Sequence, residues 1–132
     1  MKTILVDAVY CLVSEDGQIF KEMFDLLETY PNKKIVLTGA DEEGSKKFKL
    51  DTVPYEVFTL KHDPEKTDPR YYEIMLEHFN LKKEDVIYFE HNVDAVKSAE
   101  NVGIKTYLYS DETKDLESLK KFLDKNLKPK SI

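Results

Sequence analysis

Short apolar runs alternate along the chain with longer stretches in which apolar residues recur every three or four positions. The short runs are almost continuously hydrophobic, which is typical of strands buried on both faces of a parallel sheet. The first of them, Thr-Ile-Leu-Val-Asp, ends at the acidic Asp7. The pattern predicts five strands, at residues 3–7, 35–38, 55–60, 86–89 and 104–109.

The longer stretches have the periodicity of amphipathic helices. Pro31 closes the first of them, and Gly103 ends the one at about 93–102. Asp68 and Pro69 favour the start of another, because a carboxylate caps free backbone N–H groups and proline fits the first helical position. Two further helices are predicted, at about 41–48 and 112–127. Strands that alternate with helices predict a three-layer α/β/α fold of the Rossmann-like type, with a five-stranded parallel sheet.

Length and composition bound the class of protein. The 132 residues favour one domain over 1–132, with a core at 3–109 and the helix at about 112–127 after it. Hydrophobic residues make up 41% and charged residues 35%, as in soluble globular proteins. The lone Cys11 suits a reducing compartment, and the apolar run that stops at Asp7 is too short for a signal peptide or a membrane span. We therefore expect a cytoplasmic protein with no membrane partner.

The formal net charge is −6, and both signs are mixed along most of the chain. This balance argues against a nucleic-acid-binding surface. Cationic residues gather near the C-terminus, at Lys120, Lys121, Lys125, Lys128 and Lys130. We interpret them as a solvated helix face and tail, with a docking surface for an acidic partner as the alternative.

The residues just past each strand carry the candidate chemistry, because ligands of such sheets bind beyond the carboxyl ends of the strands. These residues are Asp7, Thr38 with Gly39, Lys66 ahead of a helix, and Glu90-His91-Asn92 with Asp94. Their order resembles the four motifs of the haloacid dehalogenase (HAD) superfamily. The third motif is matched by Glu-Lys-Thr-Asp-Pro-Arg-Tyr-Tyr at 65–72. The fourth is matched by Phe-Glu-His-Asn-Val-Asp-Ala-Val-Lys-Ser-Ala at 89–99 and Val-Gly-Ile at 102–104.

The resemblance covers about residues 3–109 and implies a HAD-like fold with a Mg²⁺-dependent phosphohydrolase site. Asp7 matches the nucleophile, whose carboxylate forms a covalent intermediate with the substrate. By the same resemblance, Thr38 and Gly39 would bind substrate oxygens. Lys66 would bind the substrate as well and offset the negative charge that gathers there.

The resemblance also implies a set of Mg²⁺ ligands. Asp7 and the backbone carbonyl of Val9 would supply two of them. Glu90 and Asp94, which are four residues apart, match the spacing of the acidic ligands in the fourth motif. Oxygen atoms are the ligands that Mg²⁺ prefers.

The chain departs from the HAD pattern in several places. Val9 stands where the phosphatases carry a second Asp as general acid and base, a role that typically contributes about 10²–10⁴-fold. Glu90 replaces the usual Asp of the fourth motif, and His91 a position often filled by another acid. Cys11 replaces a Thr or Ser. The segments between the motifs leave no room for a cap domain, only for a hairpin flap at 10–20, and capless relatives tend to act on large substrates.

We therefore expect a HAD-like protein whose phosphatase activity is weak or absent and which works by binding. One alternative is a working hydrolase on a phosphorylated small molecule or macromolecule, with His91 or water replacing the missing acid. Another is a non-catalytic interaction module. A receiver domain fits poorly, because Asp7 is followed by Ala8 rather than by a second acid, and Ser110 rather than a lysine follows the fifth strand.

Single residues also have plainer interpretations. Asp7 could cap a turn, Lys66 could pair with its neighbour Glu65, and His91 is expected to be an exposed loop residue. Cys11 is expected to be a small packed side chain. The two rings of Tyr71 and Tyr72 are expected to lie one inside and one outside.

Overall fold

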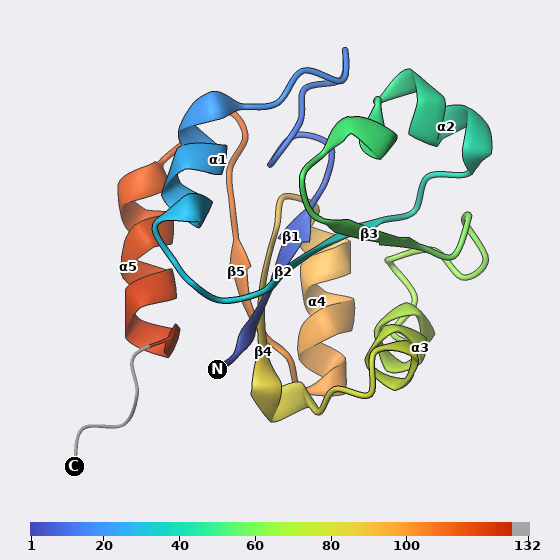
Figure 1. Cartoon of the computed structure of the whole chain (residues 1–132). Coiled ribbons are helices and arrows are strands. Elements are labelled where there is room, and N and C mark those ends of the chain that lie inside the picture. The colour runs from blue at the N-terminus through green and yellow to red at the C-terminus, as the bar shows by residue number, and fades with distance from the viewer. Residues whose placement is uncertain (128–132) are drawn as a thin grey trace.

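A five-stranded parallel sheet forms the centre of the computed structural model, which describes residues 1–127 (Figure 1). Its strands are β1 (Thr3–Asp7), β2 (Lys34–Thr38), β3 (Glu56–Thr59), β4 (Val86–Glu90) and β5 (Lys105–Leu108). They lie in the order β3-β2-β1-β4-β5, and every neighbouring pair is parallel. The predicted five-stranded parallel sheet is therefore confirmed, with strand ends that differ from the prediction by no more than one residue.

Helices cover both faces of this sheet. They are α1 (Lys21–Glu28), α2 (Glu42–Lys47), α3 (Arg70–His78), α4 (Val93–Val102) and α5 (Leu116–Leu127), with short 3₁₀ helices at Leu50–Thr52 and Lys83–Asp85. In Figure 1, α1 and α5 lie together on one side of the sheet, and α3 and α4 lie together on the other. This is the predicted three-layer α/β/α arrangement.

The helix ends follow local chemistry. The Asp68 carboxylate accepts a hydrogen bond from the Arg70 N–H at 3.0 Å, as predicted, but α3 begins at Arg70, so Pro69 precedes the helix instead of being its first residue. Gly103 ends α4 in the left-handed region, at φ +98°. Helix α5 begins at Leu116 rather than near residue 112, because the Asp115 carboxylate caps it by accepting from the Ser118 N–H at 3.0 Å.

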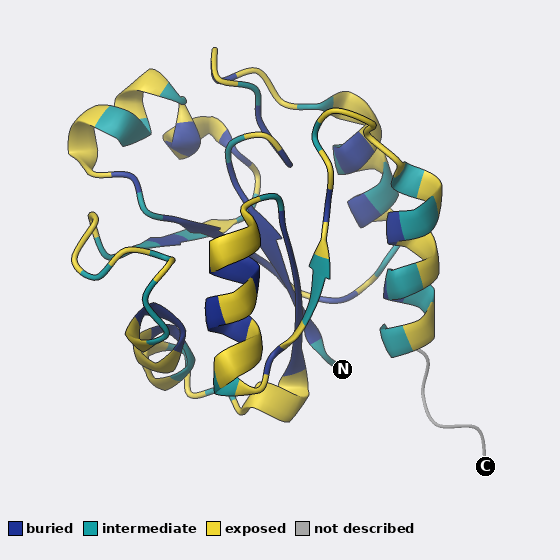
Figure 2. Cartoon of the chain, turned by 180° about the vertical axis from the view of Figure 1, so that it is seen from behind, coloured by how far each residue is buried: buried dark blue, intermediate teal, exposed yellow. Residues whose placement is uncertain are grey.

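The hydrophobic core has two parts, one on each face of the sheet. Alternate residues of a strand point to opposite faces, so Ile4 and Val6 pack under α1 and α5 while Leu5 packs under α3 and α4. In Figure 2 the buried faces of α4 and α5 turn toward the sheet. Strand β5 is more exposed than the central strands because it lies at the edge of the sheet.

The segment between β1 and α1 is a small flap. Val13 and Ile19 form an antiparallel bridge, and Gly17 takes φ +81° at the turn. A Cβ atom on Gly17 would come within 2.9 Å of the Phe48 carbonyl group, so only glycine fits where the flap meets the residues after α2. Within residues 1–127 the flap is the only insertion there, and no cap domain is present.

In residues 1–127, no helix is both long enough and apolar enough to cross a bilayer. Of the cationic residues near the C-terminus, Lys120, Lys121 and Lys125 are exposed on α5, whereas Lys128 and Lys130 lie outside the described residues. Lys120 forms an ion pair with Asp124 at 2.7 Å.

We expect the central strand to determine stability. Leu5→Ala removes a fully buried side chain and should lower the free energy of unfolding by about 2–5 kcal/mol. Leu108→Ala makes the same chemical change on a half-exposed edge residue and should cost about 1 kcal/mol or less. Urea unfolding followed by circular dichroism measures both values. Equal losses in the two variants would contradict this assignment of the core.

Candidate active site

Three charged side chains meet at the carboxyl ends of β1 and β4. The Asp7 and Glu90 side chains are 4% and 1% exposed, and they lie on neighbouring strands. Lys66, from the loop before α3, places its Nζ 2.7 Å from Asp7 Oδ1 and 2.6 Å from Glu90 Oε1. The same nitrogen donates to the Leu37 carbonyl at 3.2 Å. Lys66 therefore pairs with the two buried carboxylates rather than with its neighbour Glu65.

His91 lies between the same two carboxylates, on the side away from Lys66. Its Nδ1 forms a hydrogen-bonded ion pair with Asp7 Oδ2 and lies 3.2 Å from Glu90 Oε2. The ring of Tyr10 packs edge-on against the imidazole, with the ring centroids 5.1 Å apart. The expectation of an exposed loop histidine was wrong, because only 26% of the side chain is exposed.

Cys11 also contacts Asp7. The chain turns sharply after β1, and the Leu12 N–H donates to the Ala8 carbonyl at 2.9 Å. This turn brings the buried Cys11 thiol back over the strand end, where Sγ donates to Asp7 Oδ2 at 3.3 Å. Cys11 is packed, as expected, but it is also part of the polar cluster.

A cavity of about 260 Å³ opens beside this cluster. Thr38, Gly39 and Val9 line it, together with Asp7, Lys66 and Glu90. The Thr38 hydroxyl oxygen accepts a hydrogen bond from the Ala40 N–H at 3.1 Å, so the hydroxyl hydrogen stays available for a ligand. The structure thus brings together Asp7, Thr38, Gly39, Lys66 and Glu90, which are far apart in the sequence.

Asp94 is not in this group. It is exposed in the first turn of α4, and the residues that line the cavity do not include it. Its backbone N–H is held by the Asn92 side chain at 2.9 Å. The four-residue spacing of Glu90 and Asp94 therefore does not place both carboxylates in the cavity, because Glu90 lies on the strand and Asp94 on the outer side of the helix.

No protein-family model and no curated protein matches the sequence. Solved structures, however, resemble the fold closely. A HAD family enzyme from Bacteroides thetaiotaomicron, crystallised with magnesium and inorganic phosphate, is 12% identical with a TM-score of 0.69, over 84% of this chain and 95% of that one. The D,D-heptose 1,7-bisphosphate phosphatase of B. bronchiseptica, with magnesium and phosphate, is 13% identical with a TM-score of 0.68, over 89% and 87%. An uncharacterised Corynebacterium glutamicum protein is 14% identical with a TM-score of 0.68, over 100% and 99%.

The chain has a HAD-like fold. At 12–14% identity the likeness concerns the fold, and the chemistry has to be argued from the side chains of this chain.

The HAD fold implies Mg²⁺, and the carboxylate oxygens of Asp7 and Glu90 are of the type that this ion prefers, but protein donors already contact them. Lys66 and His91 each contact both carboxylates, and the Glu90 oxygens also accept from the Tyr88 hydroxyl and the Asn92 N–H. All four carboxylate oxygens therefore already have protein donors. A metal ion would therefore have to displace one of these contacts. The side-chain donors that gather on Asp7 Oδ2 are an imidazole nitrogen and a sulfur, which suit transition-metal ions better than Mg²⁺.

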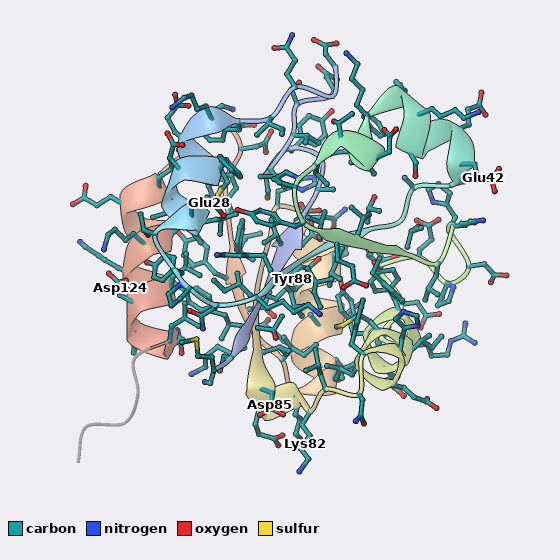
Figure 3. All side chains as sticks on the ribbon, in the orientation of Figure 1. Glu28, Glu42, Lys82, Asp85, Tyr88 and Asp124 are labelled. Carbon is teal, nitrogen blue, oxygen red and sulfur yellow. The ribbon has the colours of Figure 1, made fainter. Side chains whose placement is uncertain are left out.

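Three buried tyrosines contact the residues of this site. The hydroxyl of Tyr88, which lies near the middle of the molecule in Figure 3, donates to Glu90 Oε1. The Tyr72 hydroxyl lies 3.4 Å from that of Tyr88. The Tyr71 hydroxyl donates to the Thr38 carbonyl at 2.8 Å. The expectation that Tyr71 and Tyr72 lie one inside and one outside was wrong, since both are fully buried.

Burial and charge set the protonation of the cluster. Burial by itself raises the pKa of Glu90, but Lys66 and the hydrogen bond from His91 hold that pKa well below its usual value. Burial and the neighbouring Glu90 charge raise the pKa of Asp7 despite Lys66. Burial lowers the pKa of His91, but its hydrogen bonds to Asp7 and Glu90 prevail and raise the pKa to about 10. The imidazole is therefore a cation at neutral pH.

The raised pKa of His91 predicts a pH-dependent stability. A group whose pKa is higher in the folded chain stabilises it fully below its unfolded pKa of about 6.5, and this contribution is lost as the pH rises toward 10. Between about pH 6 and pH 9.5, the free energy of unfolding should fall more for the wild type than for His91→Gln.

Urea titrations at the two pH values measure this difference. His62→Gln is the matched control, because His62 is half exposed and pairs with Glu65 rather than with the cluster. Between the two pH values, the free energy of unfolding of His62→Gln should fall by as much as that of the wild type. Parallel pH profiles for the wild type and His91→Gln would contradict the assigned ion pair.

Proposed function

We propose that this chain is a HAD-fold protein of the phosphohydrolase type that has lost efficient phosphatase chemistry and works by binding. The observation that carries the proposal is the state of Asp7. Both oxygens of its carboxylate contact protein donors, and Val9 stands two residues later where a general acid and base is needed.

An engaged carboxylate is a poor nucleophile. Lys66 contacts one oxygen of Asp7, while His91 and Cys11 contact the other. These donors have to be displaced before either oxygen can attack phosphorus. Hydrogen bonds to the ionised form also lower the charge density that the attack requires.

The lysine of the site is engaged as well. A protonated amine has three hydrogens, and Lys66 has three acceptors at hydrogen-bond distance in Asp7, Glu90 and the Leu37 carbonyl. Its positive charge therefore neutralises the two carboxylates and is not available to an incoming phosphate. Val9 adds an apolar surface to the cavity, and the missing acid–base group accounts for a further loss of about 10²–10⁴-fold.

Binding remains within the capacity of this site. The cavity is open and uncapped, which suits a phosphorylated small molecule or a phosphorylated group on a macromolecule. The Thr38 hydroxyl and the Gly39 N–H are the polar groups that we assign to its oxygen atoms. The lone, buried Cys11 thiol supports a reducing, cytoplasmic location.

One contact favours a second candidate, a working hydrolase. His91 touches Asp7 and is protonated at neutral pH, so it is placed beside the nucleophile as a proton donor to a leaving group. This role requires the ion pair with Asp7 to break during the reaction.

An aryl phosphate assay separates the two candidates. Hydrolysis is measured with and without added Mg²⁺ for the wild type, Asp7→Asn and His91→Gln. We expect the wild type to be no faster than Asp7→Asn, since the nucleophile is engaged. Turnover that disappears in Asp7→Asn would reject the binding proposal. Turnover that also disappears in His91→Gln would support the second candidate.

Restoring the missing groups should create activity. Val9→Asp supplies the acid–base carboxylate, and His91→Ser in the same chain removes the imidazole from Asp7 Oδ2. The double variant should hydrolyse the aryl phosphate about 10²-fold faster than the wild type in the presence of Mg²⁺. Val9→Asn with His91→Ser is the matched control, because the amide has the same shape but cannot transfer the proton. Equal rates for the two double variants would contradict this account of the lost activity.

A further inference from the structure

Two residues that depart from the HAD motifs meet on one oxygen atom. Cys11 replaces a Thr or Ser of the first motif. His91 replaces an acidic residue that is often found at this position of the fourth motif. Cys11 Sγ lies 3.3 Å from Asp7 Oδ2, and His91 Nδ1 forms its hydrogen bond with the same oxygen. The ligand atoms of these three residues all lie within 4.8 Å of one another. Two departures, one after β1 and one after β4, have therefore brought a thiol and an imidazole to the same point.

Glu90 lies beside this group and contacts one of its members. Its Oε2 is 3.2 Å from His91 Nδ1. In a tetrahedral zinc site, bond lengths of about 2.0–2.3 Å place neighbouring ligand atoms roughly 3.3–3.6 Å apart. The sulfur–oxygen contact of Cys11 with Asp7 already has about this length.

We propose that Asp7, Cys11 and His91 form a binding site for a divalent transition-metal ion of the Zn²⁺ class. A set of one sulfur, one nitrogen and one carboxylate oxygen is typical for such ions and unlike the all-oxygen sites of Mg²⁺. The inference deepens the proposed function, on which it rests, because it names a ligand of the same site.

Lys66 contacts only one oxygen atom of each carboxylate, so the ion would approach from the other side. Its amine contacts Asp7 Oδ1 and Glu90 Oε1, so the amine lies on one side of the pair. His91 and Cys11 approach the opposite oxygens. Lys66, together with the Tyr88 hydroxyl, then serves as an outer shell that orients the two carboxylates.

Metal binding keeps the buried charge constant. The ion takes the place of the hydrogen bond between His91 and Asp7, and the imidazole and the Cys11 thiol each give up a proton. Two protons leave as one divalent cation enters. Mg²⁺ does not displace the thiol proton and would add uncompensated positive charge beside Lys66.

Co²⁺ is the direct probe of this site, because a thiolate ligand to Co²⁺ gives a charge-transfer absorption in the near ultraviolet and a tetrahedral site gives strong visible bands. The chain contains one cysteine, so the charge-transfer band reports on Cys11 alone. When tag-free protein is titrated with Co²⁺, the absorbance of this band should rise until one equivalent of Co²⁺ has been added. Zn²⁺ should abolish it by competition, whereas excess Mg²⁺ should not.

Variants test the sulfur and nitrogen donors. Cys11→Ser should lose the charge-transfer band, and His91→Gln should weaken Zn²⁺ binding by more than about 100-fold, beyond the loss usual for outer-shell residues. His78→Gln is the matched control, since His78 packs between the Phe58 and Phe79 rings away from the site, and it should bind like the wild type. Circular dichroism verifies that each variant is folded.

Two results would overturn the metal site. One is a wild-type spectrum without the thiolate band at saturating Co²⁺, which needs no variant to interpret. The other is an unchanged Zn²⁺ affinity in His91→Gln. Neither depends on ester hydrolysis, so a failed metal site is distinguishable from a failed binding proposal, which is rejected by turnover that requires Asp7.

Discussion

The placement of two buried carboxylates side by side at the carboxyl ends of β1 and β4 is the constraint on which the rest of this site depends. Asp7 and Glu90 are almost inaccessible to water and lie on adjacent parallel strands. Removing one partner from a buried ion pair typically costs about 3–5 kcal/mol, so the fold has to supply cations at this point. Lys66 supplies one from the loop before α3, and His91 supplies the other. The loop, the sheet and the start of α4 are thereby joined through four side chains.

The same contacts that stabilise the cluster limit its chemistry. Both oxygens of the Asp7 carboxylate are hydrogen-bonded, so in the proposed function neither is free to attack a substrate. The Lys66 amine is likewise shared between two carboxylates. Stability favours hydrogen bonds to these oxygen atoms, whereas catalysis would require one of them to be free. In this chain the contacts favour stability. Val9 is consistent with this proposal, because an acid–base group would have no role beside a carboxylate that is not free to react.

The sequence predicted the sheet, the helices and the convergence of strand ends, because these follow from hydrophobic periodicity and from the parallel arrangement. It could not predict which partners the polar side chains choose. His91 was expected to be exposed, since no local pattern records that its imidazole reaches a residue 84 positions away. Tyr71 and Tyr72 were both buried because their hydroxyl groups found partners on β2, β3 and β4, which helix periodicity alone does not reveal. The prediction that Asp94 joins Glu90 in the site was wrong for a similar reason. Sequence spacing does not show where a strand ends and which side of the next helix faces outward.

The departures from the HAD motifs are better understood together than as separate losses. Val9 alone would only remove a proton carrier, and Cys11 alone would only be a small packed side chain. His91, however, approaches the same Asp7 oxygen as Cys11, and it also lies beside Glu90. A sulfur and a nitrogen donor thus converge on an oxygen atom that Lys66 does not contact. This convergence, rather than any single substitution, is the observation on which the proposed transition-metal site rests.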